Sequence, residues 1–280
     1  MQEILIPASC ANLGPGFDTL GLAINIFNHF TFEKSSTLKI EGVDSFYATE
    51  KNLFYIAFQK VLEKINKKSS VHVIFDSHIP ISRGLGSSAS LIVGGAKAAN
   101  MLFGNKLNDK EIFDICTKIE GHPDNIAPAL FHGFNASLMD NGKPYHIKMK
   151  ISKNLFFTIY IPNFKTSTKV ARSILPKMYK KEAVIHNISR AIIMCEALKI
   201  GDIDLIKKAS SDMIHEPYRK TLIKDYNYIK KEALNKGAIA FLISGSGPTC
   251  ISISTNKYFS KELNIRNTIS NWDIIDVKII

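Results

Sequence analysis

The stretch PISRGLGSSAS, residues 80–90, has the composition of an anion-binding loop. Its glycines at positions 84 and 86 let the backbone curl, so that several N–H groups can point into one concavity. An apolar helical run follows from Leu91 to Phe103, and a helix that begins here adds the positive end of its dipole. The stretch therefore predicts an anion site, with a nucleotide phosphate as the favoured ligand, although an ordinary loop before a capped helix has a similar composition.

The segment EGHPDN, residues 120–125, brings two carboxylates, an imidazole and an amide close together in the sequence. One carboxylate could hold Mg²⁺ while the other orients or deprotonates a hydroxyl. The competing interpretation is a helix stop, with Pro123 in a turn and Asp124 as the N-cap of the next helix. A cap and a catalytic role are compatible, so both interpretations stay open.

Two further loops carry polar groups. The sequence SGSGP at 244–248 lies between two predicted strands, and it could form a second anion-binding loop or only a tight turn. The sequence ASCANLGPGFDTLG at 8–21 offers Asn12 and Asp18, which could hold a polar small molecule. A plain connection between strands is the alternative for this loop. Because the chain has two Gly/Ser loops, a shared anion site is the favoured interpretation.

The hexapeptide GLGSSA at 84–89 also matches the G-x-G-x-x-A fingerprint of nicotinamide-dependent dehydrogenases. That fingerprint follows its strand immediately, whereas SHIPISR separates GLGSSA from the strand predicted at Val71–Phe75. No Gly-Lys-Ser/Thr follows the loop, so it is not a Walker A sequence. A dehydrogenase is therefore kept only as an alternative from a different functional class.

Composition narrows the range of partners. The chain has 280 residues, is 45% hydrophobic and has a mean hydropathy of +0.01, as expected of a soluble globular protein with ample core. No apolar run approaches the ~18 residues of a membrane span, and no signal peptide is recognisable, so no membrane partner is expected. The net charge of +11 comes from 31 Lys and 5 Arg spread along the chain without a dense basic block. This spacing argues against nucleic-acid binding.

Four cysteines lie far apart, without the spacing of metal ligands: Cys10, Cys116, Cys195 and Cys250. We interpret them as reduced thiols, which predicts a cytoplasmic protein.

Periodicity predicts an α+β fold of irregular order. Strands are predicted at Gln2–Pro7, Leu20–Glu33, Leu38–Gly42, Val71–Phe75, Gly133–Met139, Tyr145–Lys150, Leu155–Ile161, Ala238–Ile243, Cys250–Ser254 and, after a last helix, Trp272–Ile280. Helices are predicted at Asn52–Asn66, 87–103, Asp109–Glu120 (capped by Asp109), a short stretch after GHPDNIAP, Ser167–Leu175, Lys180–Lys199, Asp202–Ser211 and Lys224–Lys236. A domain boundary is expected near residues 150–165.

Taken in order, four stretches resemble the GHMP small-molecule kinases: PASCANLGPGFDTLGLA (7–23), PISRGLGSSAS (80–90), EGHPDNIAPALFHG (120–133) and AFLISGSGPT (240–249). STKVARSILP (167–176) and SDMIHEPYR (211–219) extend the resemblance over nearly the whole chain. The NLGPGFD sequence is similar to the branch of the family that phosphorylates L-homoserine, in threonine biosynthesis. The chain departs from the family pattern at Cys10, where Ser or Thr is usual, and we expect activity to survive this change.

The resemblance implies a ribosomal-S5-domain-2-like N-terminal domain (1–155) and a ferredoxin-like C-terminal domain (156–280), with ATP and Mg²⁺ in the cleft between them. It implies ATP contacts at Asn52, Pro80, Ile81, Ser82, Arg83, Gly84, Leu85, Gly86, Ser87, Ser88, Ala89 and Ser90. Ser87 and Glu120 match the Mg²⁺ contacts, and Asp124 matches the catalytic aspartate, with Asn125 beside it. Substrate contacts are implied at Asn12, Asp18, His122, Thr168, Arg172 and Arg219, and a supporting loop at Ser244, Gly245, Ser246 and Gly247.

The chemistry of the implied substrate agrees with these residue types. Arg172 and Arg219 could hold a carboxylate with forked guanidinium groups, which Lys cannot imitate, while Asp18 could pair with an ammonium. Phosphoryl transfer needs mostly positioning and charge neutralisation, so whether Asp124 removes a proton stays open. Another GHMP kinase acting on a different small alcohol, and an inactive binding protein of this fold, remain alternatives. ATP and L-homoserine are the expected partners, and a homodimer is a possible assembly.

Overall fold

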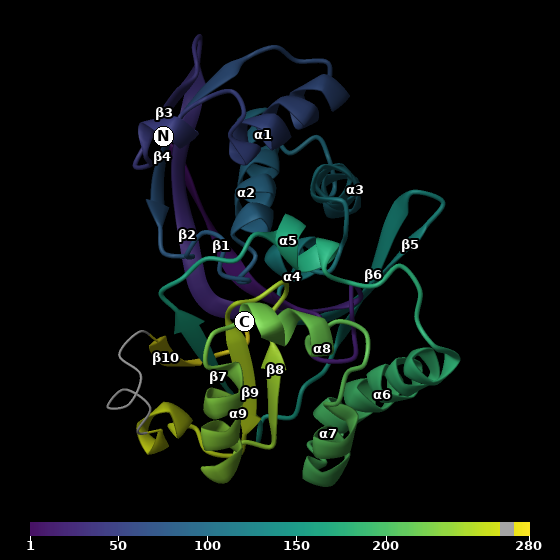
Figure 1. Ribbon diagram of the computed structural model, residues 1–280. Helices are drawn as coiled ribbons and strands as arrows, with labels where there is room; N and C mark the ends of the chain where they lie inside the picture. The colour runs from purple at the N-terminus through teal and green to yellow at the C-terminus, as the bar shows by residue number, and fades with distance from the viewer. Residues whose placement is uncertain (264–271) are drawn as a thin grey trace.

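The computed structural model describes residues 1–263 and 272–280, which form two β-sheets with helices packed against them (Figure 1). The first sheet has the strand order β3-β4-β2-β5-β6, with β1 paired to β2. Its strands are β1 (Gln2–Ala11), β2 (Leu20–Ser35), β3 (Lys39–Glu41), β4 (Ser70–Ser77), β5 (Phe134–Asp140) and β6 (Lys143–Met149). The second sheet is antiparallel, in the order β10-β7-β9-β8: β7 (Phe156–Pro162), β8 (Ala240–Ile243), β9 (Cys250–Ser254) and β10 (Trp272–Val277).

The long strand β2 organises the first sheet. It pairs with β1 along nearly its whole length, with β4 over residues 28–35 and with β5 over residues 20–22. One face of this sheet is covered by α1 (Leu53–Lys64), α2 (Ser87–Leu102), α3 (Asp109–Glu120) and α4 (Ile126–Phe131). Phe30 on β2 contacts the rings of Phe54 and Phe75 there. The helices thereby fix where the loops before α2 and after α3 begin.

The remaining helices belong to the second half of the chain. They are α5 (Thr168–Ser173), α6 (Lys181–Ile200), α7 (Ile203–Ala209), α8 (Glu216–Arg219) and α9 (Tyr226–Asn235). Apolar residues on β7 alternate between two clusters. Ile159 packs with Met194 of α6, whereas Tyr160 packs with Ile229 of α9. The second sheet is therefore covered by α6 and α7 on one face and by α9 on the other.

The two halves share one hydrophobic core. The cluster around Ile159 also contains Cys10, Leu22 and Phe134 from the first sheet. After β10 the chain returns to the first sheet, where Ile279 forms a bridge with Ile24 of β2. Because a continuous core and a returning strand join the halves, we expect their relative position to be fixed.

The structure confirms the α+β class and nearly all predicted elements, with some corrections. β1 continues to Ala11, so only residues 12–19 of the expected 8–21 loop are irregular. The cap of α3 is Asn108 and not Asp109, because Asn108 forms a reciprocal capping box with Glu111. A 3₁₀ turn at Ser45–Tyr47 and helix α8 were not predicted.

The predicted last helix appears only as a 3₁₀ turn at Phe259–Glu262, and the part that would fall on 264–271 lies outside the described residues. The two sheets change over between Met149 and Phe156. In the described part of the chain, no helix is long and apolar enough to cross a membrane.

The shared core predicts cooperative unfolding. Ile159→Ala should lower the free energy of unfolding by about 2–5 kcal/mol, because it leaves a cavity at a fully buried position, and both halves should unfold in one transition. Ile275→Ala, at a position 41% exposed, should change stability by no more than about 0.5 kcal/mol. Urea denaturation followed by circular dichroism and Trp272 fluorescence measures both. Two separate transitions in the wild type would contradict a shared core.

Candidate active site

A cavity of about 1180 Å³ lies where loops from the two halves of the chain meet. Its lining comes from segments distant in sequence, including the 12–19 loop, the loop before α2, the end of α3, α5 and α8. All but six of the predicted site residues line it. The six that do not are Pro80, Leu85, Ala89, Ser90, Ser244 and Gly247.

The loop before α2 presents a helix N-terminus to this cavity. Its backbone has positive φ at Ser82, Gly84 and Gly86, which allows the sharp curl that the sequence predicts. Gly86 is the N-cap of the 16-residue helix α2 and makes no side-chain cap hydrogen bond. A Cβ at Gly86 would lie only 1.9 Å from Oγ of Ser9. The uncapped N-terminal amides of α2 are therefore suited to an anion.

The 244–247 loop supports the loop before α2 from the second domain. Oγ of Ser244 donates to the carbonyl of Gly84 at 2.6 Å, and N of Thr249 donates to the carbonyl of Arg83 at 3.0 Å. A Cβ at Gly84 would approach the Ser244 carbonyl oxygen to 2.4 Å. Close backbone contact between the two Gly/Ser loops thus holds the anion-binding loop in place.

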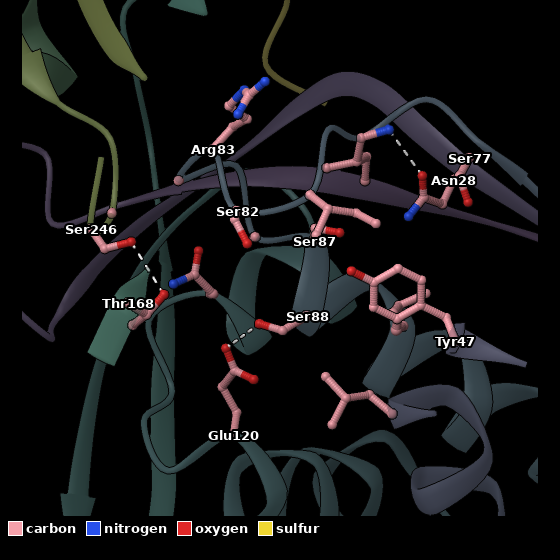
Figure 2. A pocket seen from close by; sticks show the side chains of 18 of the residues that line it. Asn28, Tyr47, Ser77, Ser82, Arg83, Ser87, Ser88, Glu120, Thr168 and Ser246 are labelled. Carbon is pink, nitrogen blue, oxygen red and sulfur yellow. Dashed lines mark hydrogen bonds between the residues drawn. The ribbon is translucent and has the colours of Figure 1, made fainter. Parts of the chain in front are cut away.

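Glu120 closes one side of the cavity beside α2. It is the last residue of α3, and Gly121, with φ of 94°, ends that helix. Figure 2 shows Ser88 and Glu120 facing each other, and Oγ of Ser88 donates to Oε1 of Glu120 at 2.7 Å. Burial raises the pKa of Glu120, although the Ser88 hydrogen bond and the His122 charge oppose this. A half-buried carboxylate next to hydroxyl oxygens is the kind of donor set that a hard divalent cation would stabilise.

Asp124 is buried at the floor of the site, with 2% of its surface exposed. Nδ1 of His122 lies 2.5 Å from its Oδ1, and Nδ2 of Asn125 donates to the same oxygen at 3.4 Å. Burial alone lowers the pKa of His122, but the hydrogen bond and charge of Asp124 outweigh it and leave the pKa raised. Asn125 is anchored in turn by Ser9, whose Oγ donates to Oδ1 at 2.8 Å. Both contacts to Asp124 use Oδ1, which leaves Oδ2 for a ligand.

The two predicted arginines have different environments. Nη1 and Nη2 of Arg172 donate to Asp18 at 3.0 and 2.8 Å, a bidentate pair. Arg219 is 2% exposed and donates from Nε and Nη1 to the carbonyls of Ala171 and Gly245. Burial, with the charge of Arg172 nearby, lowers the pKa of Arg219 to about 10. Asp18 is therefore paired with Arg172, and Arg219 joins α5 to the 244–247 loop.

Two carboxylates and one imidazole meet beside Arg172. One oxygen or nitrogen atom from each of Asp18, His122 and Asp124 lies within 4.8 Å of the other two. Because Arg172 neutralises Asp18, the cluster is less anionic than its composition suggests. It can still accept hydrogen bonds from a small cationic group such as an ammonium.

Other predicted residues shape the site from inside its walls. Asn12 donates from Nδ2 to the carbonyl of Gly245 and accepts from N of Asp18, so its amide orders the 12–19 loop. Thr168, at the start of α5, lies 3.3 Å from Oγ of Ser246, as Figure 2 also shows. Cys10 is fully buried near Ser244, and burial raises its pKa to about 12, so it is an unreactive thiol.

Sequence reasoning missed the apolar end of the cavity. Val43, Phe46, Tyr47, Phe75 and Leu91 line it, most of them near the unpredicted 3₁₀ turn. Figure 2 shows Tyr47 on the side away from Thr168 and Ser246. Asn52, one of the implied ATP contacts, caps α1 by accepting from N of Phe54 and donates to the carbonyl of Tyr47. The apolar surface and the capped turn together could hold a flat aromatic base.

Phe17 was also missed, although it sits inside the GPGFD stretch. Its ring lies 5.0 Å from the guanidinium carbon of Arg219 and 5.8 Å from that of Arg172. The ring of His215 stacks on it at 5.4 Å, and Nε2 of His215 lies 2.9 Å from the carbonyl of Gly14. Phe17 thus contacts both guanidinium groups, and only the spatial meeting of three distant segments makes this visible.

The sequence of this chain is similar to those of known proteins along its whole length. The family model described as the GHMP kinases N terminal domain matches residues 52–133, and that of the GHMP kinases C terminal matches residues 194–268. The chain is 41% identical to a homoserine kinase of Clostridium botulinum (strain Okra / Type B1), with 100% of this chain and 96% of that protein covered. A homoserine kinase of the Alaska E43 / Type E3 strain is 37% identical, with 98% and 93% covered.

Solved structures give the same result. The homoserine kinase of Cytophaga hutchinsonii superposes with a TM-score of 0.91 at 29% identity, covering 99% of this chain and 94% of that one. The mevalonate kinase of Methanococcus jannaschii has a TM-score of 0.73 at 20% identity, covering 100% and 98%, and so shares the fold.

The packing at Gly86 predicts a specific defect. Gly86→Ala should weaken binding of a non-hydrolysable ATP analogue by about 100-fold, because the new Cβ meets Ser9 where the backbone has positive φ. Gly104→Ala is the matched control: φ is +85° there, but no atom lies within 4 Å of the added Cβ. It should bind the analogue like the wild type. Isothermal titration calorimetry decides, and equal affinities for the two variants would contradict a nucleotide at this loop.

Proposed function

This chain belongs to the GHMP kinase family, and from that premise we propose that it transfers the γ-phosphoryl group of ATP to the side-chain hydroxyl of L-homoserine. The product is O-phospho-L-homoserine, an intermediate of threonine biosynthesis. The observation that carries the proposal is the meeting, in one cavity, of an uncapped helix N-terminus with the Asp18–Arg172 and His122–Asp124 pairs. Full-length similarity to homoserine kinases supports the choice of substrate.

The uncapped start of α2 supports phosphate binding at the loop of residues 80–88. Backbone N–H groups at a helix N-terminus attract negative charge through both hydrogen bonds and the helix dipole. The apolar wall around Tyr47 then receives the base, and Asn52 keeps that wall in position. These residues bind and orient ATP and take no part in covalent chemistry.

The donor set beside α2 fits Mg²⁺. Glu120 has a raised pKa because it is buried, so a cation near it would offset the cost of its charge. Glu120 and Ser87, with Ser88 bonded to Glu120, would hold the ion. When bound, Mg²⁺ neutralises the charge that accumulates on the transferring phosphoryl group.

The amino acid is bound by the polar groups on the opposite side of the cavity. Its carboxylate binds at the guanidinium pair, where Arg219 has Nη2 left after donating to two carbonyls. Its ammonium binds at Asp18, which then exchanges part of its pairing with Arg172. The amino-acid backbone is therefore held by charges of both signs, which a neutral alcohol would not satisfy.

Asp124 orients the hydroxyl that attacks the γ-phosphorus. Its Oδ1 is engaged by His122 and Asn125, so Oδ2 accepts the hydroxyl hydrogen bond. As the new O–P bond forms, the bond between the γ-phosphorus and the bridging oxygen breaks and ADP leaves. The hydroxyl proton passes to the Asp124 carboxylate, which His122 holds in position. Since the transition state is loose, orientation contributes more than early proton removal.

The dehydrogenase alternative does not agree with the topology. GLGSSA is separated from β4 by the 78–83 segment. In this sheet only the β3–β4 pair is parallel among the described strands, and all the other pairs, including β2–β4, are antiparallel. A dinucleotide fold needs the loop directly after a strand of a parallel βαβ unit.

An inactive binding protein is also disfavoured, because every polar residue that the reaction needs is present. The free thiols favour a cytoplasmic protein.

The proposal is tested with a coupled ADP-release assay on L-homoserine, L-serine, L-threonine, mevalonate and 3-amino-1-propanol, with the product identified by ³¹P NMR. L-homoserine should have the highest kcat/KM, at least about 100-fold above the amine without a carboxylate. A higher kcat/KM for mevalonate would instead favour another GHMP kinase activity.

Glu120→Gln keeps the shape and the Ser88 contact but removes the charge. We expect kcat to fall about 100-fold or more at saturating Mg²⁺, since metal and charge stabilisation contribute several kcal/mol to such reactions. The Kd for an ATP analogue without metal should change little. Steady-state kinetics and calorimetry measure these quantities, and a kcat near that of the wild type would remove Glu120 from the metal site.

Arg172→Lys keeps the positive charge but loses the bidentate contact to Asp18. We expect kcat/KM for L-homoserine to fall about 5- to 150-fold, corresponding to roughly 1–3 kcal/mol, with ATP affinity unchanged. 3-Amino-1-propanol should lose less than homoserine, because its carboxylate is already missing. An equal loss for both acceptors would assign Arg172 a purely structural role.

A further inference from the structure

Phe17 and Asp18 lie on the loop of residues 12–19, whose backbone is unfavourable by itself. Asn12, Leu13 and Asp18 have φ values of 73°, 45° and 53°, in the left-handed region that L side chains rarely adopt. Such a conformation persists only where the surrounding structure holds it. The groups that hold this loop from outside therefore determine where Phe17 and Asp18 point.

His215, the N-cap residue of α8, holds the loop from the second domain. The residue is fully buried, and its Nε2 lies 2.9 Å from the carbonyl oxygen of Gly14. Because a carbonyl only accepts, Nε2 carries the proton and donates to this oxygen. Burial lowers the pKa of His215, so the ring is neutral, and Nδ1 has no partner among the described residues. The one hydrogen bond that the neutral imidazole can donate is therefore made to the 12–19 loop.

A second buried side chain holds the next carbonyl of the loop. Nδ2 of Asn187 on α6 donates to the carbonyl of Pro15 at 3.3 Å. The same nitrogen donates to Oδ1 of Asp212 at 2.5 Å, and Oδ2 of Asp212 accepts from N of His215 at 2.8 Å. Asp212 thus joins Asn187 to His215, so that one connected group holds two consecutive carbonyls of the loop.

The ring of His215 also contacts Phe17. The two rings stack with their centroids 5.4 Å apart and 26° between their planes. The Phe17 ring in turn lies 5.0 Å from the guanidinium carbon of Arg219 and 5.8 Å from that of Arg172. Since a cation is attracted by the face of an aromatic ring, the place of Phe17 affects both guanidinium groups. His215 itself is not among the described residues that line the cavity, so it can act on a ligand only through its neighbours.

We propose that His215 is a positioning residue for the amino-acid substrate. By donating to the Gly14 carbonyl and stacking on Phe17, it places Asp18 for the ammonium of the substrate and the arginine pair for its carboxylate. The inference rests on the proposed phosphorylation of L-homoserine. In the described part of the chain, no hydrogen bond joins His215 to the nucleotide loop at residues 80–88, so binding of ATP does not depend on it.

His215→Phe keeps a ring against Phe17 but removes the donor to Gly14. The KM for L-homoserine should rise about 5- to 50-fold, because the buried carbonyl loses its partner and the loop no longer holds Asp18 in place. The kcat should fall less than about 3-fold, since Glu120 and Asp124 are unchanged. Steady-state kinetics measure both quantities, and calorimetry should give an unchanged Kd for a non-hydrolysable ATP analogue.

His215→Gln tests whether the hydrogen bond is responsible. Its amide nitrogen can take the place of Nε2 and donate to Gly14, so KM should return to within about 3-fold of the wild type. His186→Phe is the matched control, because Nε2 of His186 lies 3.1 Å from Oγ of Ser211 in an exposed pair. This variant should have the KM of the wild type.

Three results would overturn the proposal. One is a wild-type KM in His215→Phe. Another is an equal rise of KM in His215→Phe and His215→Gln, which would assign the residue to packing alone. The third is a loss of ATP-analogue affinity as large as the rise in KM, because His215 would then support the whole fold rather than the amino-acid site.

Hydrogen–deuterium exchange tests the loop without any reaction. The amides of Asp18 and Thr19 bond within the loop, to Oδ1 of Asn12 and the carbonyl of Gly16. They should exchange at least about 10-fold faster in His215→Phe than in the wild type, while amides of α2 keep the wild-type rate. Unchanged exchange in the loop would contradict the positioning role, and so would faster exchange throughout the chain.

Failure of this inference can be distinguished from failure of the proposed function. A wild-type protein that does not phosphorylate L-homoserine removes both the function and the substrate role of His215. A wild type that phosphorylates L-homoserine, with an unchanged KM in His215→Phe, removes only the positioning role.

Discussion

The structure depends on the backbone contact between the loop before α2 and the 244–247 loop. Oγ of Ser244 bonds the carbonyl of Gly84, and a side chain at Gly84 would leave no room for this approach. One loop belongs to the first sheet and its helices, the other to the second sheet. Their contact, together with the shared core around Ile159, fixes where the N-terminus of α2 opens relative to the residues of the second domain.

Buried charges determine how the cavity discriminates between ligands. Arg219 and Asp124 are buried and Glu120 is half-buried, and each has few partners: carbonyl oxygens, an imidazole or a hydroxyl. The shifted pKa values of Arg219 and Glu120 and the pairing of Asp124 with His122 suit the cavity to a zwitterion and a metal-bound polyphosphate. Neutral ligands would leave these groups without compensation, at a cost of several kcal/mol each. Selectivity therefore follows from electrostatics more than from shape.

Most of the secondary structure and the loop before α2 could be predicted from the sequence, because both depend on patterns among residues close together in the chain. Hydrophobic periodicity located the strands and long helices, and Gly/Ser spacing located the loop at residues 80–88. The parts that were missed depend on tertiary contacts. Asp18 and Arg172 pair across 154 positions of sequence, and Phe17 gains its role only where α5 and α8 approach it. Asn108, rather than Asp109, caps α3 because the reciprocal bond with Glu111 favours it.

The most direct test of the central claim is a crystal structure with a non-hydrolysable ATP analogue, Mg²⁺ and L-homoserine bound together. The account predicts the γ-phosphate at the N-terminus of α2, within hydrogen-bonding distance of the backbone N–H groups of Ser87 and Ser88. It also predicts the metal on Glu120 and the homoserine hydroxyl facing Oδ2 of Asp124. A nucleotide bound away from the 80–88 loop, or a homoserine hydroxyl turned away from Asp124, would contradict it.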